Sequence, residues 1–236
     1  ARNNSISVAK VSKLGKAGYL DDLESSLKDV MGEDFELAKS ETDHGIKPAM
    51  LIALLRAVTP HALYPYATFS PVACYASAFS HNSRNLTEYK NLVDGKGTTP
   101  NKKILVKFFK DFAGIVYREY IYWATHPEWA KLSTMKTYSG KFIKKRNNEL
   151  GKDHQVKLGI ILPLLHGLRN FVEHDADAGV ARFKYPDGFS ESKYIRYIAN
   201  QCRLRTKDCD THVFGKSKFS YIEATNHILQ EYGTVK

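Results

Sequence analysis

Long apolar runs, a secretion signal and a disulfide framework are all missing from this sequence of 236 residues. The longest apolar run, residues 158–168, is shorter than the roughly 18 residues that a membrane span requires, and Pro163 and His166 interrupt it. The opening "ARNNSISVAK" lacks the apolar core of a signal peptide. Three scattered cysteines are too few for a disulfide-rich domain. These absences favour a cytoplasmic protein that does not bind a membrane.

The apolar residues that are present suffice for one large core. The chain is 43% hydrophobic and 12% aromatic, and a chain of this length buries roughly 70% of its unfolded surface. We find no internal repeat, low-complexity tract or clear linker, so we expect a single helical domain over residues 1–236. Because the chain begins without methionine, in polar residues that resemble a continuation, we expect it to be a fragment of a longer protein.

Apolar residues recur with the three/four spacing of amphipathic helices along most of the chain. One such stripe, expected on a single buried face, comprises Ile104, Leu105, Phe108, Phe109, Phe112, Ile115, Val116 and Trp123. The pattern predicts helices over residues 19–31, 48–58, 101–125, 140–150, 157–173, 190–204 and 217–232.

Local signals refine these helices. Ser190 and Ser217 are candidate N-caps. "VARFKY" at 180–185 has the alternation of a short strand. Because helices carry the core, the predicted fold class is all-α, with at most a short strand or hairpin.

One spacing matches a catalytic motif. In "GLRNFVEHD", Arg169 and His174 have the R-x4-H spacing of HEPN-fold ribonucleases. On a regular helix that starts at Pro163, the two side chains would lie about 140° apart, on opposite flanks of a leucine stripe. We therefore expect an exposed Arg169, and a His174 in the last helical turn, where a cationic ring suits the helix dipole. Since such motifs can pair across a dimer, a ribonuclease with these two catalytic residues stays an alternative.

Two other patterns have simpler structural explanations. "PDGFSESK" imitates a metal-dependent nuclease signature, but only three residues separate Asp187 from Glu191, and Glu191 falls in the first turn of a predicted helix. Capping and the helix dipole explain an acidic residue there. "DGKGTT" at 94–99 lacks the order of glycines and lysine that wraps a phosphate, so we interpret it as a turn.

Cysteine and histidine also gather near the end of the chain. Cys202, Cys209 and His212 would be three zinc ligands, but a structural site needs four and usually has closely spaced cysteines. We expect core thiols instead, and no metal or cofactor.

Positive charge concentrates in one segment. The formal net charge is +10, and residues 131–157 contain eight basic residues against two acidic ones. Tyr138 and Phe142 lie among them, as stacking platforms for bases would. This density favours weak, salt-dependent binding of DNA or RNA, and the alternative is a solvated surface helix. The residues expected to bind nucleic acid are Lys136, Lys141, Lys144, Lys145, Arg146, Lys152 and Lys157.

Four segments together carry a resemblance to a known family. They are "ARNNSISVAK", "YLDDLESSLKDV", "IKPAMLIALLRAV" and "LGIILPLLHGLRNFVEHDADAGVARFKYPDGF". In this order they resemble a polar asparagine-containing segment and successive helices in the C-terminal part of AIPR proteins, the abortive-infection phage-resistance family. Lys47 and Pro48 depart from the acidic or apolar residues that the family often has there.

The resemblance implies bacterial antiviral defence. It also implies that nuclease-like chemistry lies upstream of this region, so no catalytic residue is carried over onto the chain. The first hypothesis is therefore a non-catalytic helical domain of a phage-defence protein that contacts nucleic acid. The alternatives are the HEPN-like ribonuclease and a protein-interaction module, and oligomerisation stays open.

Overall fold

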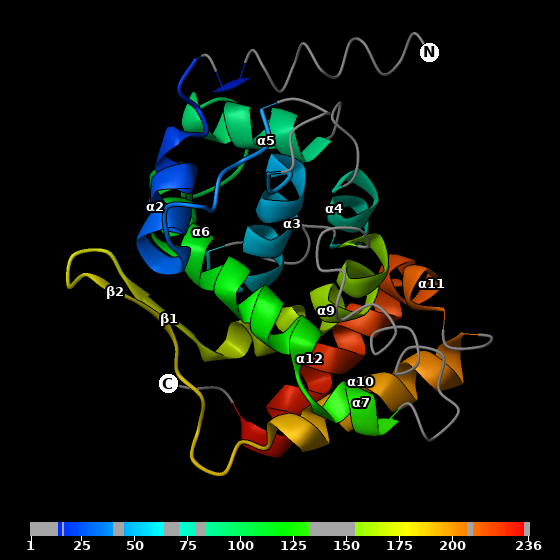
Figure 1. Cartoon of the computed structure of the whole chain (residues 1–236). Coiled ribbons are helices and arrows are strands. Elements are labelled where there is room, and N and C mark those ends of the chain that lie inside the picture. The colour runs from blue at the N-terminus through cyan, green and yellow to red at the C-terminus, as the bar shows by residue number, and fades with distance from the viewer. Residues whose placement is uncertain are drawn as a thin grey trace, which may run out of the picture. The chain divides into compact units, whose positions relative to one another are not determined.

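The computed structural model describes residues 14–15, 17–39, 45–63, 71–78, 84–132, 154–206 and 210–233 (Figure 1). Over these residues the fold is mainly helical with one two-stranded sheet, so the predicted all-α class is confirmed. They form two compact units, residues 1–118 with 172–182, and residues 119–171 with 183–236. The sequence showed no such division, and the single domain expected over residues 1–236 stays a prediction.

The first unit is built around a helix that is buried on every side. Its elements are α2 (Asp21–Met31), α3 (Pro48–Val58), α4 (Pro71–Ser77), α5 (Arg84–Val93), most of α6 (Lys102–Thr125), and the hairpin of β1 (Val172–Asp175) and β2 (Val180–Phe183). All residues of α3 are buried, and α4 and α5 pack on it. Pro48 opens α3 within its first turn, as predicted. Arg56 is the one charged residue in this apolar helix.

Helix α6 lies where its apolar stripe predicted it. The stripe residues from Leu105 to Val116 are buried, except for Ile115, which is half-buried, and a Cβ at Gly114 would lie 2.1 Å from the Ser26 carbonyl oxygen of α2. Only glycine at that position permits such a close helix crossing. The prediction for Ile104 was wrong: its side chain is exposed, because it lies at the edge of the stripe beside the exposed Lys107.

The second unit packs its helices around α9. Its elements are the end of α6, α7 (Glu128–Leu132), α9 (His154–Leu168), the 3-10 turn η2 (Arg169–Phe171), α10 (Glu191–Arg205), α11 (Thr211–Lys216) and α12 (Lys218–Tyr232). Residues 158–168 are buried, and α11 and α12 pack on α9. Gly167 and Gly215 permit this packing, because a Cβ at either would lie 2.8 Å or 2.7 Å, respectively, from a backbone oxygen of a neighbouring helix. The helix predicted over residues 140–150 lies outside the described residues.

The structure of α9 differs from the helix assumed for Arg169 and His174 at both ends. Pro163 lies inside the helix rather than at its start. A proline inside a helix removes one helical hydrogen bond, the one to the carbonyl four residues before it. Nearer the end of α9, the Tyr194 hydroxyl donates to the Leu164 carbonyl at 2.8 Å. The helix also ends at Leu168, so the predicted extent to residue 173 was too long. His174 therefore lies on strand β1 and not in a last helical turn.

The predicted strand and the positions of both predicted N-caps are confirmed. The strand expected in "VARFKY" is β2, and its partner β1 is the segment that the sequence had assigned to a helix. Ser190 caps α10 through its side chain, which accepts from the Lys193 amide at 3.4 Å. Ser217 occupies the N-cap position of α12 without a side-chain cap hydrogen bond.

Candidate functional site

The described structure reaches little of the predicted nucleic-acid-binding segment. Lys136, Lys141, Lys144, Lys145, Arg146 and Lys152 lie outside the described residues. Lys157 lies in α9, where only the backbone is described. At the start of the segment, the exposed Lys131 ammonium lies 3.2 Å from the buried Glu128 carboxylate. The expected phosphate contacts of this segment therefore stay predictions.

Arg169 and His174 have other surroundings than the sequence predicted. Arg169 lies in η2 with only 6% of its surface exposed, so the prediction of an exposed arginine was wrong. The helix ends before it, and the tighter 3-10 turn gives its side chain a different direction. The buried His174 ring lies 2.9 Å from the Asp111 carboxylate and packs edge-on against Phe108. Through these contacts, His174 anchors the hairpin on α6.

The residues of the nuclease-like segment 186–193 and of the cysteine and histidine group have structural roles where they are described. Glu191 lies in the first turn of α10, as predicted, and Asp187 is exposed on the preceding turn. Cys202 is a buried core thiol, while Cys209 lies outside the described residues. Among the described residues, no group of three or more His, Cys, Asp or Glu side chains could hold a metal ion.

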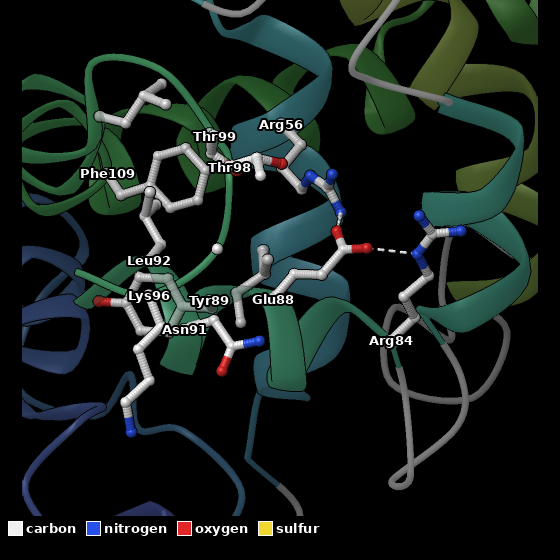
Figure 2. A pocket seen from close by; sticks show the side chains of 13 residues that line it. Arg56, Arg84, Glu88, Tyr89, Asn91, Leu92, Lys96, Thr98, Thr99 and Phe109 are labelled. Carbon is white, nitrogen blue, oxygen red and sulfur yellow. Dashed lines mark hydrogen bonds and ion pairs between the residues drawn. The ribbon is translucent and has the colours of Figure 1, made fainter. Parts of the chain in front are cut away.

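A cavity of about 350 Å³ opens in the first unit between α3, α5, α6 and the turn that follows α5 (Figure 2). Its size lies within the range of small-molecule pockets. One part of the lining is apolar, from Ile52, Leu92, Leu105 and Phe109. The other part is polar and includes Arg56, Arg84, Glu88, Asn91, Thr98 and Thr99. The cavity therefore suits a ligand with one charged end and one less polar end.

Two arginines converge on one carboxylate at this cavity. Arg56 Nη1 lies 2.5 Å from Glu88 Oε2, and Arg84 donates from Nε to Glu88 Oε1. Figure 2 shows the Glu88 carboxylate between the two guanidinium groups. The Arg56 side chain is 7% exposed, Glu88 is 30% exposed and Arg84 is 70% exposed. The cluster thus joins a fixed inner arginine to an outer arginine in solvent, with one net positive charge.

Contacts between helices explain why Arg56 has a fixed position. Asn85, fully buried at the start of α5, donates to the carbonyls of Ala49 in α3 and Cys74 in α4. Its remaining oxygen accepts from Arg56 Nη1 at 3.3 Å. Asn85 therefore ties three helices together and holds the guanidinium beside Glu88. Burial raises the pKa of the neighbouring Cys74 thiol to about 11, so this thiol stays protonated at neutral pH.

The turn predicted in "DGKGTT" forms one edge of the cavity. Gly95 and Gly97 adopt the left-handed region with φ near 70° and 80°, which suits glycine. Asp94 anchors the turn: its carboxylate accepts from the Tyr19 hydroxyl and from Lys90 Nζ, each at 2.6 Å. These hydrogen bonds, first that of Lys90, lower the Asp94 pKa to about 2. The Lys96 ammonium, 3.4 Å from Asp94, points away from the arginines in Figure 2.

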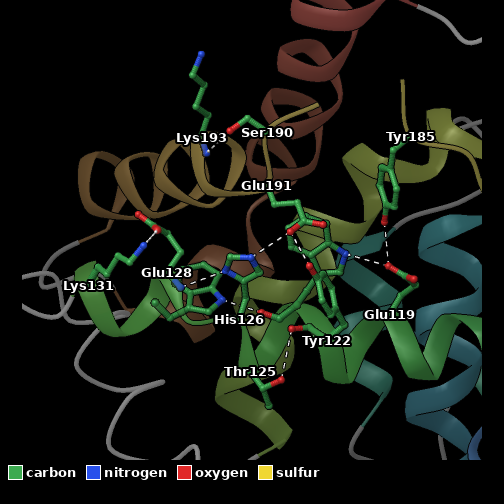
Figure 3. A network of polar contacts seen from close by, with 12 residues as sticks. Glu119, Tyr122, Thr125, His126, Glu128, Lys131, Tyr185, Ser190, Glu191 and Lys193 are labelled. Carbon is green, nitrogen blue, oxygen red and sulfur yellow. Dashed lines mark hydrogen bonds and ion pairs between the residues drawn. The ribbon is translucent and has the colours of Figure 1, made fainter. Parts of the chain in front are cut away.

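A second polar network lies in the second unit (Figure 3). Glu191 Oε2 accepts from the Tyr122 hydroxyl at 2.5 Å and lies 3.2 Å from His126 Nε2. The Glu128 amide donates to His126 Nδ1, so the proton of a neutral ring is on Nε2 and points toward Glu191. Desolvation, followed by the hydrogen bond to Glu191, raises the Tyr122 pKa to about 12.

The other carboxylate of this network, Glu119, accepts hydrogen bonds from two neutral donors. Glu119 Oε2 accepts from the Tyr185 hydroxyl at 2.9 Å and from Trp123 Nε1 at 3.2 Å. Burial and the nearby Glu119 raise the Tyr185 pKa, so the hydroxyl stays a donor. The network connects the end of α6 with the start of α10. We call these residues, Glu119, Tyr122, Trp123, His126, Tyr185 and Glu191, the clamp, because they hold these segments together.

The arginine-lined cavity was not predicted from the sequence, although the sequence contains one sign of it. An arginine within the apolar run "PAMLIALLRAV" must find a buried partner, since an unpaired buried charge is costly. The partner is supplied by "RNLTEYK", whose Arg84 and Glu88 are four residues apart on one helix face. Only the packing of α5 on α3 brings these groups together.

Within the described part of the chain, no helix combines the length and apolarity needed to span a membrane. No protein-family model, curated protein or solved structure matches the chain.

Proposed function

We propose that this chain is a non-catalytic helical module of a cytoplasmic phage-defence protein, and that it binds nucleic acid through phosphate contacts. The observation that carries the proposal is the convergence of Arg56 and Arg84 at an open cavity. Guanidinium groups match phosphate oxygens bidentately, and an arginine in solvent at the rim can reach a phosphate of a bound strand.

The charge of the whole chain supports the same proposal. The net charge of +10 attracts polyanions, and the segment 131–157 carries much of it. The membership of the AIPR family is part of the proposal and rests on the resemblance of the quoted segments. The ribonuclease alternative has less support, because Arg169 is buried and His174 contacts Asp111.

Fluorescence anisotropy tests the proposal with labelled single-stranded and duplex oligonucleotides at several salt concentrations. We expect a Kd on the order of 10⁻⁴ to 10⁻⁶ M with little sequence preference, and a steep loss of affinity with salt. A triple variant with Lys144, Lys145 and Arg146 changed to Glu should bind more weakly and have a flatter salt slope. Wild-type binding that is absent at low salt would contradict the proposal and favour a protein-interaction module.

A further inference from the structure

We propose that the arginine-lined cavity binds the phosphate monoester of a nucleotide, with Glu88 as a built-in competitor for the two arginines. The ligand is either a free mononucleotide or the phosphorylated end of a nucleic-acid strand, and both present the same chemistry. The inference rests on the proposed function in that Arg56 and Arg84 supply the phosphate contacts in both. The preferred phosphate at this site is the monoester.

Charge is the first reason to prefer a monoester. A phosphate monoester carries about −1.5 to −2 at neutral pH, whereas each backbone diester carries about −1. The arginine pair already has a carboxylate of charge −1 between its guanidinium groups. A diester offers the pair no more charge than Glu88 does, while a monoester offers up to twice as much. The built-in carboxylate therefore weakens diesters more than monoesters.

The different exposure of the two arginines is the second reason. Arg56 is fixed by Asn85 at the inner end, while Arg84 is mostly in solvent at the first position of α5. An exposed arginine side chain can change rotamer at little cost, so Arg84 can leave Glu88 and close over an incoming phosphate. Glu88, 30% exposed, can then turn toward solvent. The binding step exchanges one anion for another at the same cations.

The form of the cavity is the third reason. A diester continues as a chain on both sides of its phosphate, but a monoester has a single substituent that a cavity of about 350 Å³ can enclose. The apolar lining of Leu92, Leu105 and Phe109 suits the face of a base or a sugar edge. Asn91, Thr98 and Thr99 provide amide and hydroxyl groups for hydrogen bonds to the sugar or base.

Isothermal titration calorimetry on the full chain tests the inference with adenosine 5′-monophosphate and adenosine. We expect the monophosphate to bind at least roughly tenfold more tightly, since charge-assisted hydrogen bonds to a phosphate exceed that difference. Arg84→Ala should weaken the monophosphate roughly tenfold, and Glu88→Gln should tighten it by about three- to tenfold, because the competitor loses its charge. Arg118→Ala, an exposed arginine of α6 outside the cavity lining, is the matched control and should change nothing.

Two oligonucleotides with the same sequence, one with a 5′-phosphate and one with a 5′-hydroxyl, identify the source of the ligand. Preference for the phosphorylated strand assigns the site to strand ends, and binding of the free monophosphate without that preference assigns it to mononucleotides. Each of these results supports the inference. Equal affinity for adenosine and its monophosphate, together with equal affinity for the two strands, would overturn it.

The same measurements separate the inference from the proposed function. If the 5′-hydroxyl strand binds in a salt-dependent way that Arg84→Ala does not affect, nucleic-acid binding stands through other basic residues and the inference fails. If the monophosphate binds while neither strand does, the inference stands and the proposed function fails. Thermal unfolding of Arg84→Ala and Glu88→Gln verifies that the variants are folded. Should Glu88→Gln unfold, the opposite prediction for the exposed Arg84 still decides the outcome.

Discussion

Two of the carboxylate-centred clusters among the described residues differ in what surrounds each carboxylate. In the first unit, Glu88 contacts two guanidinium cations at the wall of a cavity. In the second unit, Glu119 and Glu191 accept hydrogen bonds from tyrosine hydroxyls and ring N–H groups. Cations can exchange one anion for another, whereas neutral donors satisfy one carboxylate and do not attract a second anion. The first cluster is therefore suited to a ligand, and the second to holding helices together.

The two clusters also differ in burial. Trp123 is fully buried and also accepts at its carbonyl from Trp129 Nε1 at 2.7 Å, so the clamp is fixed by packing. Arg84 projects into solvent and is fixed mainly by Glu88. Loss of a clamp residue should thus reduce stability and leave phosphate binding unchanged, and loss of Arg84 should do the reverse.

The largest expected effect comes from Trp123→Ala. Removing a fully buried tryptophan should lower the free energy of unfolding by about 3–5 kcal/mol, because packing and burial are lost together. Urea unfolding measures the change, and Ile104→Ala, an exposed apolar residue on the same helix, is the matched control. The folded fraction of Trp123→Ala should bind adenosine monophosphate like the wild type. A loss below about 1 kcal/mol would contradict the role of the clamp.

A smaller effect is expected from the two tyrosine donors of the clamp. Tyr185→Phe removes a hydrogen bond to the Glu119 carboxylate and should cost about 1.5–3 kcal/mol. Tyr122→Phe removes the corresponding bond to Glu191, but Tyr122 is half exposed, so water replaces the donor and the cost should be smaller. Chemical denaturation of both variants compares them directly. An equal or reversed order would show that burial does not set the strength of these bonds.

The smallest effect concerns the turn at the cavity. The folded pKa of Asp94 lies near 2, below its ordinary 3.8, so its stabilising contribution is complete above about pH 4 to 5. The contribution is lost as pH falls through the folded pKa. The melting temperature of Asp94→Asn should therefore lie below that of the wild type at neutral pH, and the gap should close toward pH 2. Asp29→Asn, an exposed carboxylate of α2, is the control. A gap independent of pH would refute this account.

Much of the fold could be predicted from the sequence because local patterns determine it. The spacing of apolar residues predicted α3 and α6 to within a residue, since one face must be buried whatever the neighbours are. Ser190 marked the start of α10 for an equally local reason. The end of α9 was not predictable in this way, because "RNFVEHD" fits a helix as well as a strand. The pairing with β2 decides its conformation.

The sequence by itself determined the helical class, the net positive charge and the segments with apolar faces. Only the tertiary structure decided which polar groups meet. Arg56 and Glu88 are separated by 32 residues, and they approach to 2.5 Å because α5 packs on α3 through Asn85. His174 likewise meets Asp111 from a hairpin far along the chain. Apolar periodicity is encoded within a few helical turns, whereas a binding cavity depends on contacts between distant segments, which no local pattern specifies.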